Sequence, residues 1–148
     1  GDPKKYPFHS ALNSSAEEAD FSFSGIKTAV VNLMHNAAQK GETLSKADIA
    51  ASFQRAVCDT LTLKAVHAAK EHGFNTLALA GGVSANRALR SSLARACEEQ
   101  GIRFCCPDFR YCTDNAAMIA CAGHYALMAG ELSGLDLNAA PELPLVQR

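Results

Sequence analysis

Residues 80–86 carry the residue types best suited to hold a phosphate or a nucleotide. The segment contains Gly81, Gly82, Ser84 and Asn86, and it follows a short apolar run. Paired glycines let the backbone approach a ligand closely, and a helix that follows them offers free N–H groups and a positive dipole end. Asn86 adds one acceptor and two donors, which suit a ring edge or a ribose hydroxyl. The competing interpretation is a plain tight turn whose glycines permit close packing.

A second segment, residues 112–120, places one carboxylate, Asp114, immediately before a helical pattern. Carboxylate oxygen is a hard ligand that suits a divalent cation. A negative charge at the start of a helix is also favoured by the helix dipole alone. One aspartate does not make a metal site, so the residue chemistry leaves both interpretations open.

The six cysteines predict free thiols. No C-x-x-C or H-x-x-x-H pair occurs, and three cysteines fall in helical patterns, where we expect small buried hydrophobes: Cys58, Cys97 and Cys121. The alternative is that the other three cysteines bind a metal ion together with His124, although their spacing is less regular than such sites usually show: Cys105, Cys106 and Cys112. Free thiols favour a reducing, cytoplasmic location.

Hydrophobic spacing predicts the elements that position these segments. Helical spacing covers residues 26–39, 45–72, 84–100 and 114–130. Short apolar or alternating runs predict strands at 21–24, 76–80 and 102–106. The run at 76–80 has no polar side, which is typical of a strand buried on both faces. Helices alternating with strands predict a layered α/β domain.

End signals sharpen several of these helices. Ser45 is an N-cap candidate whose partner in a capping box would be Asp48, and Gly73 suits a left-handed C-cap. Thr113 is the cap candidate for the last helix. We expect an irregular lead-in over residues 1–19, an α/β lobe over 20–131 and an extended tail over 132–148. Because the chain opens with Gly1 instead of methionine, we expect a segment of a longer protein.

Composition and missing motifs argue against several classes of function. The chain has 148 residues and a net charge of −1, so no overall positive field indicates nucleic-acid binding. Five arginines gather locally, and acidic neighbours favour a solvated face for them: Arg87, Arg90, Arg95, Arg103 and Arg110. No apolar run approaches the roughly 20 residues that span a bilayer, so we expect no membrane contact. The motifs G-x-S-x-G, H-E-x-x-H and the P-loop do not occur.

Three blocks in order resemble one family. They are residues 20–29 (DFSFSGIKTA), 80–87 (AGGVSANR) and 112–120 (CTDNAAMIA). They are similar to the threonylcarbamoyladenosine-forming tRNA transferases, long labelled O-sialoglycoprotein endopeptidases or glycoproteases. The resemblance implies ribonuclease-H-like lobes of the actin/Hsp70/sugar-kinase superfamily. It also implies transfer of a threonylcarbamoyl group from threonylcarbamoyl-adenylate to adenosine in tRNA.

The resemblance also implies roles for two residues. Asn86 matches the asparagine that contacts the adenylate substrate, and Asp114 matches a metal-ligand aspartate. The family's metal, iron or zinc, is also held by two histidines of an H-x-x-x-H motif that this chain lacks. We therefore expect this chain alone to be inactive, and we expect partner proteins that include a paralogous subunit.

Three other functions compete with this one. A non-catalytic paralogue would serve as an interaction partner, although a retained metal aspartate speaks against a pure scaffold. A metallopeptidase, as in the old label, needs a general base beside its zinc ligands, and no such motif occurs. A sugar or acetate kinase of the same superfamily matches the three blocks less well.

Overall fold

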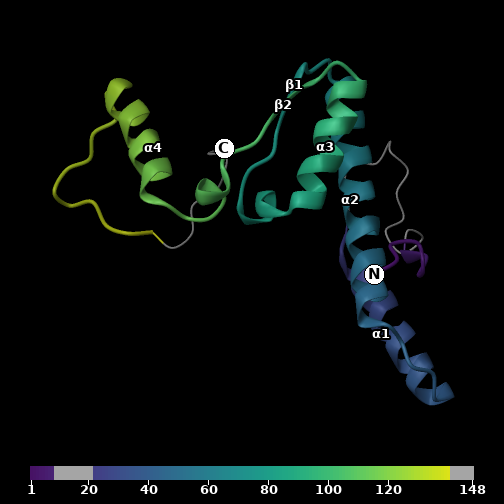
Figure 1. The fold of residues 1–148 in the computed structure, drawn as a ribbon. Helices are drawn as coiled ribbons and strands as arrows, with labels where there is room; N and C mark the ends of the chain where they lie inside the picture. Colours follow the sequence, from purple (N-terminus) through teal and green to yellow (C-terminus); the bar gives the residue numbers. More distant parts are fainter. Residues whose placement is uncertain (9–21, 141–148) are drawn as a thin grey trace. The chain divides into compact units, whose positions relative to one another are not determined.

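The structure, a computed structural model, describes residues 1–8 and 22–140. It comprises two compact units, Gly1–Thr113 and Asp114–Arg148. The first unit contains α1 (Ser24–Lys40), α2 (Lys46–Glu71), β1 (Thr76–Ala78), α3 (Arg87–Glu99) and β2 (Arg103–Cys105) (Figure 1). Two short 3-10 helices accompany them, η2 (Gly82–Ala85) and η3 (Phe109–Tyr111), and the second unit contains α4 (Ala116–Met128). These elements confirm the α/β class.

The first helix begins where the sequence predicts a strand. α1 starts at Ser24, so the strand predicted over 21–24 is wrong in its described part, and Phe21 lies outside the described residues. The hydroxyl of Ser22 accepts the N–H of Ser24 at 3.3 Å, and the Phe23 carbonyl accepts the N–H of Lys27 at 3.2 Å. Serine favours such local bonds at helix starts, and they outweigh a four-residue alternation.

The second helix has the predicted ends but only half of the predicted capping box. Ser45 Oγ accepts the N–H of Asp48 at 3.3 Å, and Gly73 ends the helix at φ +68°. The carboxylate of Asp48 does not accept the backbone N–H of Ser45, as a capping box requires. It accepts the N–H of Asp2 at 2.8 Å, which lowers the pKa of that carboxyl. The N-terminal segment competes successfully for this acceptor because it lies along α2.

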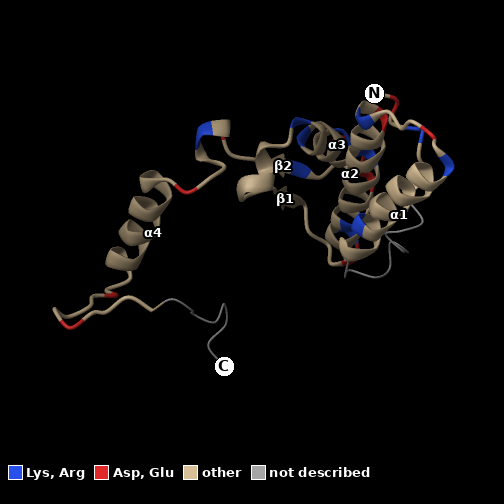
Figure 2. Ribbon diagram, turned by 90° about the horizontal axis from the view of Figure 1, so that it is seen from below, with Lys and Arg blue, Asp and Glu red and all other residues tan. Residues whose placement is uncertain are grey.

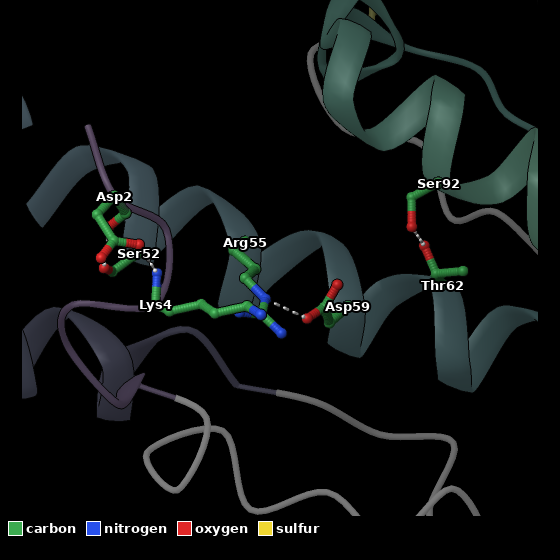
Figure 3. Close-up of polar contacts among 7 residues, drawn as sticks. All are labelled: Asp2, Lys4, Ser52, Arg55, Asp59, Thr62 and Ser92. Carbon is green, nitrogen blue, oxygen red and sulfur yellow. Dashed lines mark hydrogen bonds and ion pairs between the residues drawn. The ribbon is translucent and has the colours of Figure 1, made fainter. Parts of the chain in front are cut away.

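Polar contacts along α2 bind the N-terminal segment at one point and α3 at another. Ser52 Oγ donates to the Asp2 carbonyl at 3.1 Å and accepts the N–H of Tyr6 at 3.1 Å. Within α2, Arg55 Nε lies 3.3 Å from Asp59 Oδ2 one turn further along, and the two form an ion pair (Figure 3). Further along, the Thr62 hydroxyl donates to Ser92 Oγ of α3 at 2.9 Å (Figure 3). These contacts fix the N-terminal segment and α3 to the same long helix.

The strands form a parallel pair joined by α3. β1 pairs with β2 in the register Thr76 with Arg103 and Leu77 with Phe104. Three helix residues, Leu89, Leu93 and Cys97, are buried between α2 and the strands, and the burial of Cys97 confirms the prediction for that residue. The helix itself starts later than predicted, at Arg87, because η2 occupies residues 82–85.

The strand predicted at 76–80, which contains β1, is not buried on both faces by the described residues. Leu77 and Leu79 pack on the helices, whereas Thr76, Ala78 and Ala80 are exposed. Among the described residues of the first unit, helices pack against one face of the strand pair. One face of this apolar strand is therefore left exposed to solvent by the described residues of the unit.

The second unit is dominated by α4, whose cap differs from the prediction. Asn115, not Thr113, caps the helix, because its side-chain oxygen accepts the N–H of Met118 at 3.0 Å. The helix has no lysine, arginine, aspartate or glutamate (Figure 2). None of its residues is buried, so the expected burial of Cys121 is not observed. Among the described helices, none combines the length and the apolarity that a membrane span requires.

The predicted domain limits stay predictions. The expected boundary between the lead-in and the lobe, at residues 19 and 20, lies within residues 9–21, which are outside the described residues. The described part of the tail, to residue 140, contains no helix or strand.

Candidate functional site

The glycine-rich segment forms a loop at the carboxyl end of β1, where ligands bind in open α/β sheets. Its backbone folds on itself: the Gly81 carbonyl accepts the N–H of Ser84 at 2.9 Å, and the Val83 carbonyl accepts the N–H of Asn86 at 2.9 Å. α3 begins immediately afterwards. The structure therefore brings four predicted site residues into one turn: Gly81, Gly82, Ser84 and Asn86.

The two glycines differ in why they are needed. Gly81 has φ +81° and ψ 176°, a conformation that is essentially confined to glycine. Gly82 has no such φ, and apart from the adjoining residues no atom of the described chain lies within 4 Å of a Cβ built at either position. The close-packing explanation for this pair is therefore wrong. Gly82 instead leaves open space over an exposed backbone, which is what close approach of a ligand requires.

The two polar side chains of the loop are used differently. Asn86 is the N-cap of α3, and its Oδ1 accepts the N–H of Leu89 at 3.1 Å. The bond uses the amide oxygen and leaves the two amide N–H donors without a partner among the described residues. Ser84 is fully buried, and its Oγ has no hydrogen-bond partner in the described chain. Contact between this hydroxyl and a ligand would require the loop to open.

Arg90 holds the loop, a role that the sequence analysis missed. Its Nε donates to the Ser84 carbonyl, and Nη2 donates to the Pro107 carbonyl at 2.6 Å. The guanidinium also lies 4.1 Å from the ring centroid of Phe109. A sequence signal existed, because a basic residue in the first turns of a helix is opposed by the dipole and needs another reason to be there. The solvated-face prediction is therefore wrong for Arg90.

Arg95 and Arg110 have ordinary surface environments. Arg95 lies 3.9 Å from Glu99 with 76% of its side chain exposed, and Arg110 lies 3.9 Å from Asp108 with 72% exposed. Pairs this exposed contribute little to stability. For these two residues the solvated-face prediction is confirmed.

Asp114 is the first residue of the second unit. It is exposed and precedes the cap residue Asn115, so it lies outside α4. The dipole explanation for its position weakens accordingly, since the carboxylate is not in the first turn. No described residue bonds to its carboxylate, which leaves both oxygens available to a cation.

The residues present do not complete a metal site. Across residues 1–8 and 22–140, no three histidine, cysteine, aspartate or glutamate side chains come together in a way that could hold an ion. The cysteine alternative is therefore not supported. Cys112 is buried with its thiol donating to the Asp108 carbonyl at 3.6 Å, and its sulfur also lies 3.0 Å from Arg90 Nη2.

Comparison with known proteins points in one direction. A family model described as "TsaD: tRNA N6-adenosine threonylcarbamoyltransferase" matches residues 2–121. A protein named tRNA N6-adenosine threonylcarbamoyltransferase from Caldicellulosiruptor saccharolyticus is 46% identical over 148 residues, which is 100% of this chain and 43% of that protein. Proteins of the same name from Moorella thermoacetica and Staphylococcus aureus are 45% and 47% identical over 98% and 85% of this chain. Those two alignments cover 42% and 37% of the relatives. The chain thus spans about two fifths of the length of the curated relatives that it matches.

Proposed function

Because the chain belongs to the family of tRNA N6-adenosine threonylcarbamoyltransferases, we propose that it forms part of an enzyme that transfers a threonylcarbamoyl group from threonylcarbamoyl-adenylate to adenosine in tRNA. The observation that carries this proposal is the family match over residues 2–121, which includes the whole glycine loop. Neither a peptidase nor a kinase has comparable support, since the relatives described above all carry the transferase name.

The glycine loop binds the adenylate half of the substrate in this account. The exposed backbone at Gly82 approaches the phosphate, and the start of α3 adds the positive end of its dipole. The two amide N–H groups of Asn86 donate to the nucleoside while its oxygen remains on Leu89. Gly81 shapes the turn through its φ of +81°, and Ser84 contributes its carbonyl to the bond with Arg90.

Asp114 supplies one carboxylate oxygen to a divalent metal, iron or zinc. One ligand does not suffice, because affinity depends on ligand number and geometry. The two histidines that complete the set in the family would come from outside this chain, which has no H-x-x-x-H motif. This chain alone is therefore inactive, and a complete enzyme needs the remaining ligands.

The wider setting follows from the family. The α/β unit forms part of a ribonuclease-H-like lobe, and tRNA is the acceptor. Partner proteins that include a paralogous subunit assist the reaction. We place the reaction in the cytoplasm, because all six cysteines are free thiols, which suit a reducing compartment.

The proposal is tested in a chimera in which this chain replaces the matching 43% of the C. saccharolyticus relative. Asp114→Ala should lower formation of threonylcarbamoyladenosine by more than about a hundredfold, because a metal ligand is lost. It should also lower the metal content of the purified chimera. Folding should not change, since Asp114 is exposed and outside α4.

Asp136→Ala is the matched control, because Asp136 is also exposed in the second unit. Its activity and metal content should equal those of the unaltered chimera. Full activity of Asp114→Ala would exclude the metal-ligand role and return the non-catalytic paralogue to consideration.

A further inference from the structure

Arg90 connects the loop after β1 with the segment after β2. From the first turns of α3 it donates to the carbonyl of Ser84 on one side and to the carbonyl of Pro107 on the other, the latter at 2.6 Å. The same guanidinium lies 3.0 Å from Cys112 Sγ and 3.5 Å from Cys106 Sγ. One side chain therefore fixes two segments that are separated by the whole of α3 and β2.

The geometry suits arginine and no other residue. The planar guanidinium offers five N–H donors in a rigid fork, so it bonds to two segments at once and still stacks on an aromatic ring. Here the ring is that of Phe109, whose centroid is 4.1 Å from the guanidinium carbon. Lysine has a single ammonium group and no planar face, and it cannot reproduce both carbonyl bonds and the stack.

The loop has little else to hold it. Its own backbone bonds are the Gly81–Ser84 and Val83–Asn86 pairs, and no described atom packs within 4 Å of a Cβ at Gly81 or Gly82. The buried hydroxyl of Ser84 contributes no bond in the described chain. Arg90 is thus the principal side-chain contact that restrains the loop from outside it.

We propose that Arg90 is a positioning residue for adenylate binding: it holds the Gly81–Asn86 loop against the 106–112 segment, so that the loop backbone and the Asn86 amide meet the substrate. The inference rests on the proposed function, because it assigns the residue that maintains the substrate loop. Arg90 touches no substrate atom in this account and acts through Ser84.

The first test uses the isolated chain and needs no substrate. In an amide NMR spectrum, Arg90→Met should shift or broaden the resonances of Gly81 and Gly82, because the Ser84 carbonyl loses its external donor. Arg95→Met on the same helix is the control and should leave them in place, since Arg95 pairs with Glu99 and has no contact with the loop among the described residues. Unchanged glycine resonances in Arg90→Met would overturn the inference directly.

The second test separates positioning from simple destabilisation in the chimera. Arg90→Met should raise KM for threonylcarbamoyl-adenylate by about ten- to a hundredfold, as expected when a binding loop is displaced by about 1 Å. The kcat should stay within about threefold, and KM for tRNA should not change. Arg90→Lys should give an intermediate KM. A purely structural role would instead reduce the active fraction, which lowers kcat and leaves KM unchanged.

The outcomes distinguish the two claims. An active chimera in which both Arg90 variants keep the original KM overturns the inference and leaves the proposed function intact. A folded chimera without activity before any substitution contradicts the proposed function and, with it, the role of Arg90 in substrate binding.

Discussion

Asn86 has an observed role at one end of its amide and a proposed role at the other. Its oxygen caps α3 through Leu89, and its nitrogen is the proposed donor to the adenylate. Asn86→Asp should keep the cap, because aspartate is as good an N-cap as asparagine. It should nevertheless raise KM for threonylcarbamoyl-adenylate in the chimera, since both N–H donors are lost and a negative charge faces the phosphate. Urea denaturation and steady-state kinetics measure the two effects separately.

Asn86→Ala is the companion variant, because it removes both functions. It should lower the free energy of unfolding by about 1 kcal/mol as well as raising KM. If Asn86→Asp bound the adenylate as tightly as the unaltered chimera, Asn86 would be a helix cap alone.

Cys97 should make the free energy of unfolding depend on pH. Burial raises the pKa of the Cys97 thiol. The pKa of the Cys58 thiol is also raised, mainly by burial and to a smaller extent by the negative charge of Asp59. Below the ordinary thiol pKa of about 8.5 both thiols are neutral in the folded and unfolded states. Above it the unfolded chain ionises first, so the free energy of unfolding should fall as pH rises toward the higher folded pKa.

Urea unfolding at about pH 7 and about pH 9.5 tests this expectation. Cys97→Ala should reduce the loss of stability between the two conditions. The control is Cys121→Ala, because Cys121 is exposed and should leave the loss unchanged. A loss equal in all three proteins would show that Cys97 does not contribute to it.

At the scale of elements, α3 is the centre of the first unit. Leu93 is 3% exposed and packs with Leu89 and Cys58 between α2 and the strands. Leu93→Ala should lower the free energy of unfolding by about 2–5 kcal/mol, through lost burial and the cavity that remains. Leu63→Ala is the matched control: Leu63 on α2 is 52% exposed, and its loss should change stability by less than about 0.5 kcal/mol. Equal losses for both variants would contradict the assigned core.

Sequence patterns predicted these elements well where local chemistry decides them. Ser45 and Gly73 bound α2 as expected, and the parallel strands flank α3. Prediction failed where two local solutions compete. Asn115 displaced Thr113 as the cap of α4, and the serine at 22 favoured a helix start over a strand.

The candidate site was predictable only in part for a similar reason. Gly81 and Asn86 stand out because their residue types are unusual after an apolar run. Arg90 offers only the weak signal of a basic residue near a helix start, and its partners cannot be read from the sequence, since Pro107 and Cys112 become its neighbours only when β2 pairs with β1. Long-range contacts of this kind have no local sequence pattern.

At the scale of the whole molecule, the exposed face of the strands and the exposed α4 agree with the coverage of the relatives. Thr76 and Ala78 are exposed on β1 although the strand is apolar, and α4 is apolar without a buried residue. The chain matches only about two fifths of the relatives' length. In our account the chain holds one part of a site whose remaining ligands lie elsewhere in the enzyme.

Nucleoside mass spectrometry of tRNA tests this account most directly. tRNA is incubated with threonylcarbamoyl-adenylate, partner proteins and either this chain or the chimera. We predict threonylcarbamoyladenosine with the chimera and none with this chain alone. Product formed by the chain alone would contradict the divided site, and a folded chimera that forms none would contradict the proposed function.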